Sequence, residues 1–195
     1  MKVLGLTGGI GMGKSACAAL LSARAIPIID TDELARDVVE LGQAALAEIE
    51  RTFGRGVLDE SGRLRRDELA RVVFADSNAR VRLEQILHPR IRERWRAQVE
   101  RWRSEDHPLA VVVIPLLFET GAEKELDRTL CVACSAATQR TRLLARGWPN
   151  EQIQQRNAAQ WPVERKLALA DFVIWTEGDL ALHAAQLDRV LAGLR

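Results

Sequence analysis

The stretch Gly8-Gly9-Ile10-Gly11-Met12-Gly13-Lys14-Ser15 determines how this chain must fold. It fits the pattern G-x-x-x-x-G-K-[ST] throughout, and it lies between an apolar run at 3–7 and a helix-forming run at 16–21. A strand, a glycine-rich loop and a helix in this order are the context in which the pattern forms a phosphate-binding loop. The alternative, a plain glycine-rich turn, needs no Lys-Ser pair at the start of a helix. We therefore expect this stretch to bind a nucleoside triphosphate.

The residue types in the loop suit this chemistry. Glycine lets the backbone adopt positive φ and approach a ligand closely. Successive amide N–H groups at a helix N-terminus then cradle the phosphate oxygens. Lys14 is predicted to reach the β- and γ-phosphates, and the Ser15 hydroxyl is predicted to hold Mg²⁺. The residues predicted to bind the nucleotide here are Gly9, Gly11, Met12, Gly13, Lys14, Ser15 and Ala16.

Five short apolar runs predict the strands of a parallel sheet. Each run is brief and almost continuously apolar, as strands covered on both faces are. The runs are 3–7, 26–29, 109–114, 129–134 and 172–175. Helical stretches alternate with them, so the predicted fold class is α/β, a doubly wound parallel sheet with helices on both sides. Ligands of such sheets bind beyond the carboxyl ends of the strands, and the phosphate loop lies there.

Two long segments interrupt this alternation. Residues 32–106 show helical periodicity without a strong strand, and Asp59-Glu60-Ser61-Gly62 predicts a turn within them. Residues 138–165 are helical with glycine and proline breaks, and their arginines suit a lid for phosphoryl transfer. We predict a core of 1–31, 107–137 and 166–195, an inserted helical substrate-binding subdomain of 32–106 and a lid of 138–165.

Composition and charge argue against several classes of function. An apolar content of 47% over 195 residues suffices for a real core, and a net charge of +1 does not indicate a nucleic-acid partner. No apolar run approaches the roughly 18 residues of a membrane span. The first predicted strand begins almost at Met1, so we expect no leader peptide and a cytoplasmic protein without a membrane partner. Cys131 and Cys134 fit C-x-x-C, but on a strand they face opposite sides, which argues against a redox pair or a zinc site.

Two carboxylates end the second predicted strand. Asp30 and Asp32 would flank the phosphate loop, and Asp32 is our candidate for the group that orients or deprotonates an acceptor hydroxyl. The alternative is that Asp32 merely caps a helix that begins at Glu33.

Three further features have both a structural and a functional interpretation. The third predicted strand runs into Pro115-Leu116-Leu117-Phe118-Glu119 instead of the aspartate typical of switch GTPases, and Glu119 could contact substrate or the metal's water shell. His88-Pro89 is expected to end one helix and begin another. Eight arginines between positions 80 and 103 form either a solvated helix face or a basic surface for an anionic substrate.

Together these motifs resemble the dephospho-CoA kinase family along nearly the whole chain. The phosphate loop alone is shared by a large superfamily, whereas Thr7-Gly8-Gly9-Ile10-Gly11 combined with Pro115–Glu119 and His88-Pro89-x-Ile91 is far more selective. The other motifs that carry the resemblance are Asp30-Thr31-Asp32, Gly62-Arg63-Leu64-Arg65-Arg66, Gln139-Arg140 and Ala170-Asp171-Phe172-Val173-Ile174. The chain departs from the family at Trp175-Thr176-Glu177-Gly178, because an asparagine usually stands near the start of that loop.

The resemblance implies a P-loop kinase fold like that of nucleoside monophosphate kinases, with a five-stranded parallel sheet in a three-layer core, an inserted helical substrate domain and a helical lid. It implies transfer of the ATP γ-phosphate to the ribose 3′-hydroxyl of dephospho-CoA, the last step of coenzyme A synthesis, with Mg²⁺. Asp32 matches the acidic residue at that hydroxyl, and Arg140 and Arg146 match lid arginines at the phosphates. The expected catalytic residues are Asp32, Lys14 and Arg140; His88 and Glu119 join Asp32 as expected substrate contacts.

Two other functions remain open from the residues alone. One is a different small-molecule kinase of this architecture, acting on a nucleoside monophosphate or a sugar acid. The other is an ATP-dependent regulatory module that binds a protein partner, which the two aspartates beside the loop disfavour. We expect a monomer or a weak homo-oligomer.

Overall fold

The computed structural model of the chain describes residues 1–194, with the exception of the side chain of Phe74. Arg195, the last residue of the predicted core, lies outside the described residues. The chain divides into two compact units, one formed by Met1–Asp30 with Arg101–Arg195 and the other by Thr31–Glu100. The functional roles of the predicted subdomain and lid, and their boundaries, stay predictions.

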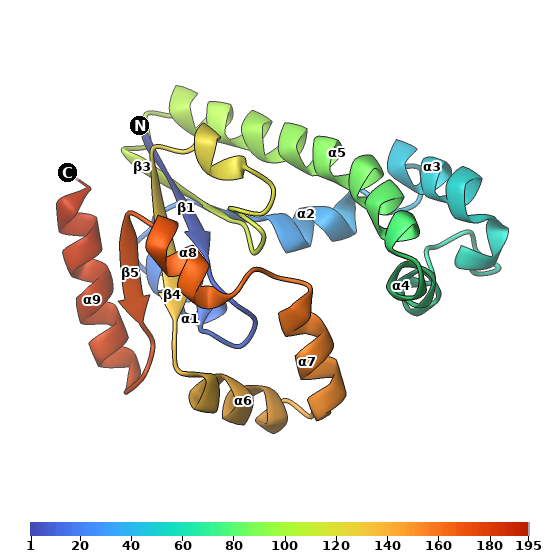
Figure 1. Cartoon of the computed structure of the whole chain (residues 1–195). Helices are drawn as coiled ribbons and strands as arrows, with labels where there is room; N and C mark the ends of the chain where they lie inside the picture. The colour runs from blue at the N-terminus through green and yellow to red at the C-terminus, as the bar shows by residue number, and fades with distance from the viewer. Residues whose placement is uncertain (195) are drawn as a thin grey trace. The chain divides into compact units, whose positions relative to one another are not determined.

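The first unit is built on a five-stranded parallel sheet with the strand order β2-β3-β1-β4-β5 (Figure 1). The strands are β1 (Lys2–Thr7), β2 (Ile28–Asp30), β3 (Leu109–Val113), β4 (Arg128–Ala133) and β5 (Phe172–Trp175). The predicted fold class is confirmed, and each predicted strand lies within one or two residues of an observed one. The register aligns Leu6 with Val113 and Val113 with Asp30, so the carboxyl ends of these three strands meet at one edge.

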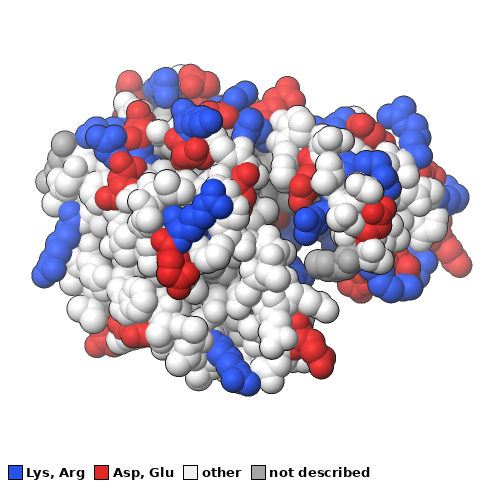
Figure 2. All heavy atoms as spheres, in the orientation of Figure 1, with Lys and Arg blue, Asp and Glu red and all other residues white. Residues whose placement is uncertain are grey.

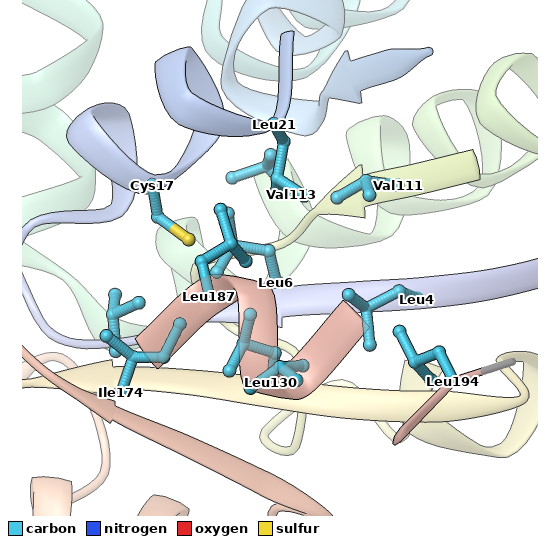
Figure 3. Close-up of a cluster of buried hydrophobic side chains, with 12 residues drawn as sticks. Leu4, Leu6, Cys17, Leu21, Val111, Val113, Leu130, Ile174, Leu187 and Leu194 are labelled. Atoms are coloured by element: carbon cyan, nitrogen blue, oxygen red, sulfur yellow. The ribbon is translucent and has the colours of Figure 1, made fainter. Parts of the chain in front are cut away.

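Helices cover both faces of this sheet. On one face, α1 (Lys14–Ser22) and α9 (Leu180–Gly193) pack on the strands. Figure 3 shows Cys17 and Leu21 of α1 and Leu187 of α9 turned towards strand side chains such as Leu6 and Val113 in this apolar cluster. The remaining helices of the unit are α6 (Ala136–Ala145), α7 (Asn150–Ala158), α8 (Val163–Leu169), which packs on β4, and the short η2 (Ala122–Glu125). The breaks predicted at Gly147, Pro149 and Pro162 lie between helices, as expected.

The outer strand β5 has its backbone partly covered by a side chain. The Gln186 amide of α9 accepts a hydrogen bond from the Trp175 N–H at 2.9 Å and donates one to the Trp175 carbonyl at 2.8 Å. These are the two groups that a neighbouring strand would bind, so the amide replaces a sixth strand at this residue.

The second unit is helical. It contains α2 (Thr31–Asp37), α3 (Ala44–Phe53), the short η1 (Arg55–Val57), α4 (Arg66–Ala75) and most of α5 (Ser77–Ser104). The predicted turn at Asp59–Gly62 is confirmed: Asp59 Oδ1 accepts hydrogen bonds from Ser61 N, Ser61 Oγ and Arg63 N. The hydrogen bond from the Ser61 hydroxyl is the main cause of the lowered pKa of Asp59.

The prediction that His88-Pro89 separates two helices is wrong, because Pro89 lies inside the 28-residue helix α5. A proline inside a helix removes a backbone hydrogen bond and costs about 3 kcal/mol. Packing outweighs this cost, since side chains on both sides of Pro89 join one apolar cluster with α3 and α4; they are Leu83, Ile86, Leu87 and Ile91. Arg90 adds a hydrogen bond to the Ile86 carbonyl at 2.6 Å and an ion pair with Glu48 of α3 at 2.6 Å.

Several of the α5 arginines are engaged within their own unit. Besides Arg90, Arg94 donates to the Gln43 side chain at 2.6 Å, and Arg80 and Arg82 lie within 4 Å of an acidic side chain. Among the described residues visible in Figure 2, acidic and basic side chains are interspersed. No helix in residues 1–194 combines the length and the apolar character needed to cross a membrane.

The N-terminus of α6 is capped by two residues from different parts of the chain. Ser135 Oγ accepts a hydrogen bond from Thr138 N, and Glu177 Oε1 accepts from Ser135 N at 2.9 Å and from Thr138 Oγ1 at 3.0 Å. Hydrogen bonding from Ser135, first from its hydroxyl and then from its N–H, lowers the pKa of Glu177 to about 2. Glu177 thereby fixes the loop after β5 to the start of α6.

This cap predicts a pH dependence of stability. Because the folded-state pKa of Glu177 lies below its ordinary value of 4.5, the carboxylate stabilises the fold above pH 4.5, and this stabilisation is lost as pH falls through about 2. We expect Glu177→Gln to lower the melting temperature at pH 7, with a deficit that shrinks steadily below pH 4.5. Thermal unfolding followed by circular dichroism between neutral and acidic pH measures it. Glu60→Gln in the exposed turn is the control, and a deficit independent of pH would contradict the assignment.

Candidate active site

The phosphate loop leaves β1 after Thr7 and enters α1 at Lys14, as predicted. Two of its glycines are required by their surroundings. Gly8 has φ of 148°, and a Cβ there would lie 2.3 Å from the Val132 carbonyl oxygen. Gly13, which precedes α1, is left-handed with φ of 99°, and a Cβ would lie 3.0 Å from the Thr176 side chain. A side chain at either position would displace the loop, so its backbone conformation depends on glycine.

Lys14 and Ser15 stand in the first turn of α1. The Lys14 ammonium donates hydrogen bonds to the Gly8 carbonyl at 2.6 Å and the Gly9 carbonyl at 3.0 Å, so its side chain folds back across the loop. Ser15 is exposed, and Ala16 is partly exposed. The loop thus presents a cation, a hydroxyl and the amide groups of a helix N-terminus, which together suit an anionic ligand.

Three neighbouring elements hold the loop from outside. Gln139 of α6 donates to the Ile10 carbonyl at 2.8 Å, and Thr176 after β5 donates to the Met12 carbonyl at 3.0 Å. The Met12 side chain is buried with Ala133 and Cys134 at the end of β4, and with apolar side chains of α8. Because the Ile10 and Met12 carbonyls and the Met12 side chain are fixed in this way, the loop is preorganised before a ligand binds.

The arginines of α6 differ in their environment. Arg142 donates to the Thr176 hydroxyl at 2.9 Å and to the Thr176 carbonyl at 2.5 Å, and so it is linked through Thr176 to the Met12 carbonyl. Arg140, the predicted catalytic arginine, is exposed and donates to Asn150 at 3.2 Å. Arg146 is exposed at the end of α6. The structure therefore brings Arg142 to the rim of the loop, whereas Arg140 and Arg146 point to solvent.

Arg142 and Thr176 were missed in the sequence, where Arg142 was only one of several arginines in the segment. Helical periodicity contained the signal: residues three and four apart share a helix face, so Arg142 lies beside Gln139, three residues earlier. Gln139 is buried and bonded to the loop. Thr176 belongs to the loop in which this chain departs from the family pattern, so no motif marked it.

The two predicted carboxylates occupy different elements. Asp30 is the last residue of β2, paired in register with Val113 at the carboxyl edge of the sheet. Asp32 is exposed in the first turn of α2, which begins at Thr31. The alternative, that Asp32 caps a helix beginning at Glu33, is therefore wrong, because the helix already begins at Thr31. An acidic side chain in the first turn still interacts favourably with the helix dipole.

The two other predicted substrate contacts have partners or burial of their own. Glu119 Oε1 forms an ion pair with Lys166 at 2.7 Å and accepts a hydrogen bond from Trp161 N at 2.9 Å. His88 lies half-buried in α5, and burial is the main cause of its lowered pKa. His88 belongs to the second unit, whereas the phosphate loop belongs to the first. The role of His88 stays a prediction.

The three cysteines are buried as free thiols. Burial raises the pKa of Cys17 to about 12 and that of Cys131 to about 11, and it also raises the pKa of Cys134. Thiols with raised pKa values are poor nucleophiles at neutral pH. The chemistry of the site thus lies in the loop amides and the charged side chains around them.

Comparison with known proteins agrees with this geometry. A family model described as dephospho-CoA kinase matches residues 2–181. The dephospho-CoA kinase of Anaeromyxobacter dehalogenans is 48% identical, with 100% of this chain and 93% of the relative covered; that of Bdellovibrio bacteriovorus is 39% identical, with 100% and 96% covered. The crystal structure of TT1252 from Thermus thermophilus superposes with a TM-score of 0.85 at 38% identity, covering 100% of this chain and 98% of that one. This chain belongs to the dephospho-CoA kinase family.

Proposed function

We propose that this chain transfers the γ-phosphate of ATP to the ribose 3′-hydroxyl of dephospho-CoA, the last step of coenzyme A synthesis. The observation that carries the proposal is the preorganised phosphate loop with Lys14 folded across it. ATP-dependent phosphorylation is the reaction of the family to which the chain belongs, and family membership selects the acceptor.

The loop supplies the electrostatic part of the mechanism. When the phosphates bind, Lys14 exchanges the Gly8 and Gly9 carbonyls for the β- and γ-phosphate oxygens. Charge that spreads over the γ-phosphate during transfer then meets amide dipoles and an ammonium that are already in place. Because the loop carbonyls stay bonded to Gln139 and Thr176, little reorganisation accompanies the reaction.

The arginines have two proposed roles. Arg142, held at the loop rim by Thr176, binds the nucleotide from the side of the β5–α9 loop. Arg140 and Arg146 act on the phosphates when residues 138–165 close as a lid. Support for the second role is that both guanidinium groups are exposed and are thus able to reorient without breaking a buried contact.

Asp32 is proposed to orient the 3′-hydroxyl and to accept its proton. Its carboxylate is exposed, and it follows the carboxyl end of β2 by two residues. A positioned carboxylate of this kind is the usual acceptor of the substrate proton in kinases. The helical unit, with His88 and the α5 arginines, is proposed to receive dephospho-CoA.

The residues at the loop fit a nucleotide-bound Mg²⁺. This ion usually keeps several waters and takes few protein oxygens in addition to substrate phosphates. The exposed Ser15 hydroxyl in the first turn of α1 is a donor of that type. We propose that Ser15 holds Mg²⁺, which when bound neutralises charge on the phosphates.

A cytoplasmic location and a monomeric or weakly oligomeric state complete the proposal. The three free thiols are compatible with a reducing compartment.

The substrate is tested by coupled ADP release with dephospho-CoA, AMP, gluconate and shikimate offered separately. Of these four acceptors, we expect only dephospho-CoA to be phosphorylated. For Lys14→Ala we expect kcat to fall by roughly a hundredfold or more, because the variant lacks one cation at the charge that develops on the γ-phosphate. Circular dichroism checks that the variant is folded. Faster turnover with another acceptor would favour a different small-molecule kinase, and wild-type turnover by Lys14→Ala would refute the role of the loop.

Asp32→Asn separates an acceptor-orienting carboxylate from a helix-stabilising one. We expect kcat to fall by about a hundredfold or more, since general-base assistance is lost, while the KM for ATP stays within about twofold. Steady-state kinetics with ATP and dephospho-CoA varied in turn measure both. The matched control is Glu33→Gln, which removes the neighbouring charge from the same first turn. Equal kcat values for the two variants would assign Asp32 to the helix only.

The two α6 arginines are distinguished by which constant each affects. We expect Arg142→Ala to raise the KM for ATP about tenfold with a smaller change in kcat, because a charge-assisted contact beside the loop is lost. Arg140→Ala is expected to lower kcat with a smaller change in KM. The same kinetics decide, and a wild-type KM for Arg142→Ala would contradict the proposed contact.

A further inference from the structure

The bulkiest fully buried side chain in residues 1–194 is a charged one, Lys166 of α8. A buried ammonium is costly unless it is paired and hydrogen-bonded. Lys166 Nζ lies 2.7 Å from Glu119 Oε1 and donates to the Pro115 carbonyl at 2.8 Å. The free energy that is lost when the Lys166 ammonium is buried calls for a functional explanation.

The contacts of this pair join three segments of the first unit. The Pro115 carbonyl also accepts a hydrogen bond from the Thr7 hydroxyl at 3.2 Å, and Thr7 is the last residue before the phosphate loop. Glu119 Oε1 also accepts from the Trp161 N–H at 2.9 Å. Trp161 stands between α7 and α8, near the end of the predicted lid. The pair therefore connects the exit of the lid stretch to the strand that carries the loop.

The same charges act close to the loop lysine. Burial raises the pKa of Cys131, while the ammonium groups of Lys166 and Lys14 lower it and the Glu119 carboxylate raises it. One thiol of β4 is thus influenced by all three groups.

Stability alone does not account for the pair. Glu119 Oε2 is buried and has no hydrogen-bond partner among the described residues. Apolar side chains of similar volume often replace a buried ion pair without loss of stability, or with a gain. The direct apolar contact of α8 with Met12 already packs this helix against the loop.

We propose that Glu119 and Lys166 are positioning residues for phosphoryl transfer. They act through Trp161 and Pro115. They hold the C-terminal end of the predicted lid, near Trp161, against the phosphate loop, so that water is kept from the γ-phosphate. The inference rests on the proposed kinase function, and it assigns Glu119 a role within the protein beside the predicted substrate contact, which stays a prediction.

Two oxygens compete to attack the γ-phosphorus, that of the 3′-hydroxyl of dephospho-CoA and that of water. In the coupled reaction, the 3′-hydroxyl oxygen forms the new P–O bond, its proton leaves to the base, and the bond to ADP breaks. In the leak, a water oxygen forms that bond, a proton of this water leaves to solvent, the bond to ADP breaks in the same way, and inorganic phosphate is released. Exclusion of water by a closed lid suppresses the leak.

The test measures inorganic phosphate released per molecule of CoA formed, at saturating ATP and dephospho-CoA. We expect Lys166→Met to raise this ratio about tenfold, because Glu119 loses the ammonium that joins it to the Pro115 carbonyl. We expect the same of Glu119→Leu, because the Trp161 N–H loses its acceptor. The matched control is Lys124→Met, the same change at an exposed lysine, which is expected to keep the wild-type ratio. Since the ratio counts only turnovers, partial unfolding of a variant does not alter it.

A double variant separates positioning from folding. Glu119→Leu with Lys166→Met removes both charges, so we expect a melting temperature near that of the wild type and a leak that stays raised. A wild-type ratio in the double variant, or in both single variants, would overturn the proposal. A wild-type protein that forms no CoA would instead refute the kinase function, so the two failures are distinguishable.

Discussion

The close approach of Gly8 to the Val132 carbonyl is the constraint on which the site depends. The chain has room there for backbone alone, so it must turn sharply as it leaves β1. The turn places the following amides at the N-terminus of α1 and sends the Met12 side chain into the core beside β4. Gln139 and Thr176 then bind carbonyls on the outside of the loop. The surface that we propose to bind phosphate is thus a consequence of the packing behind it, and the ligand need not create it.

Local patterns in the sequence were sufficient for the sheet and the loop. The five strands are short apolar runs, and the loop pattern has few alternatives, so both were predicted closely. The helix boundary predicted at Pro89 is wrong because the packing of α5 on both sides of Pro89 outweighs the local preference of proline. Lys166 and Glu119 were also beyond local reading, because their pairing arises only when segments distant in sequence meet in the folded core.

The site residues differ in how far the sequence locates them. The motif fixes the spacing of Lys14 and Ser15, whereas the position of Arg142 beside the loop emerges only from the folded contacts of α6 with Thr176. The roles of Lys14, Ser15 and Arg140 stay predictions. The α5 arginines show a related limit, since Arg90 and Arg94 look like a free basic face in the sequence but are bonded to α3 or the residue before it. Charge counted along a chain overstates the charge offered to a ligand.

The amide of Gln186 on the outer strand has a consequence for how copies of this chain meet. Val173 and Trp175 of β5 are more than two-fifths exposed, and an apolar strand at a sheet edge is a common starting point for aggregation. A second molecule that adds a strand here must first displace both hydrogen bonds between Gln186 and Trp175. A single glutamine on α9 thus opposes intermolecular β-sheet growth at this edge, because it occupies the backbone groups of Trp175 that an added strand would need.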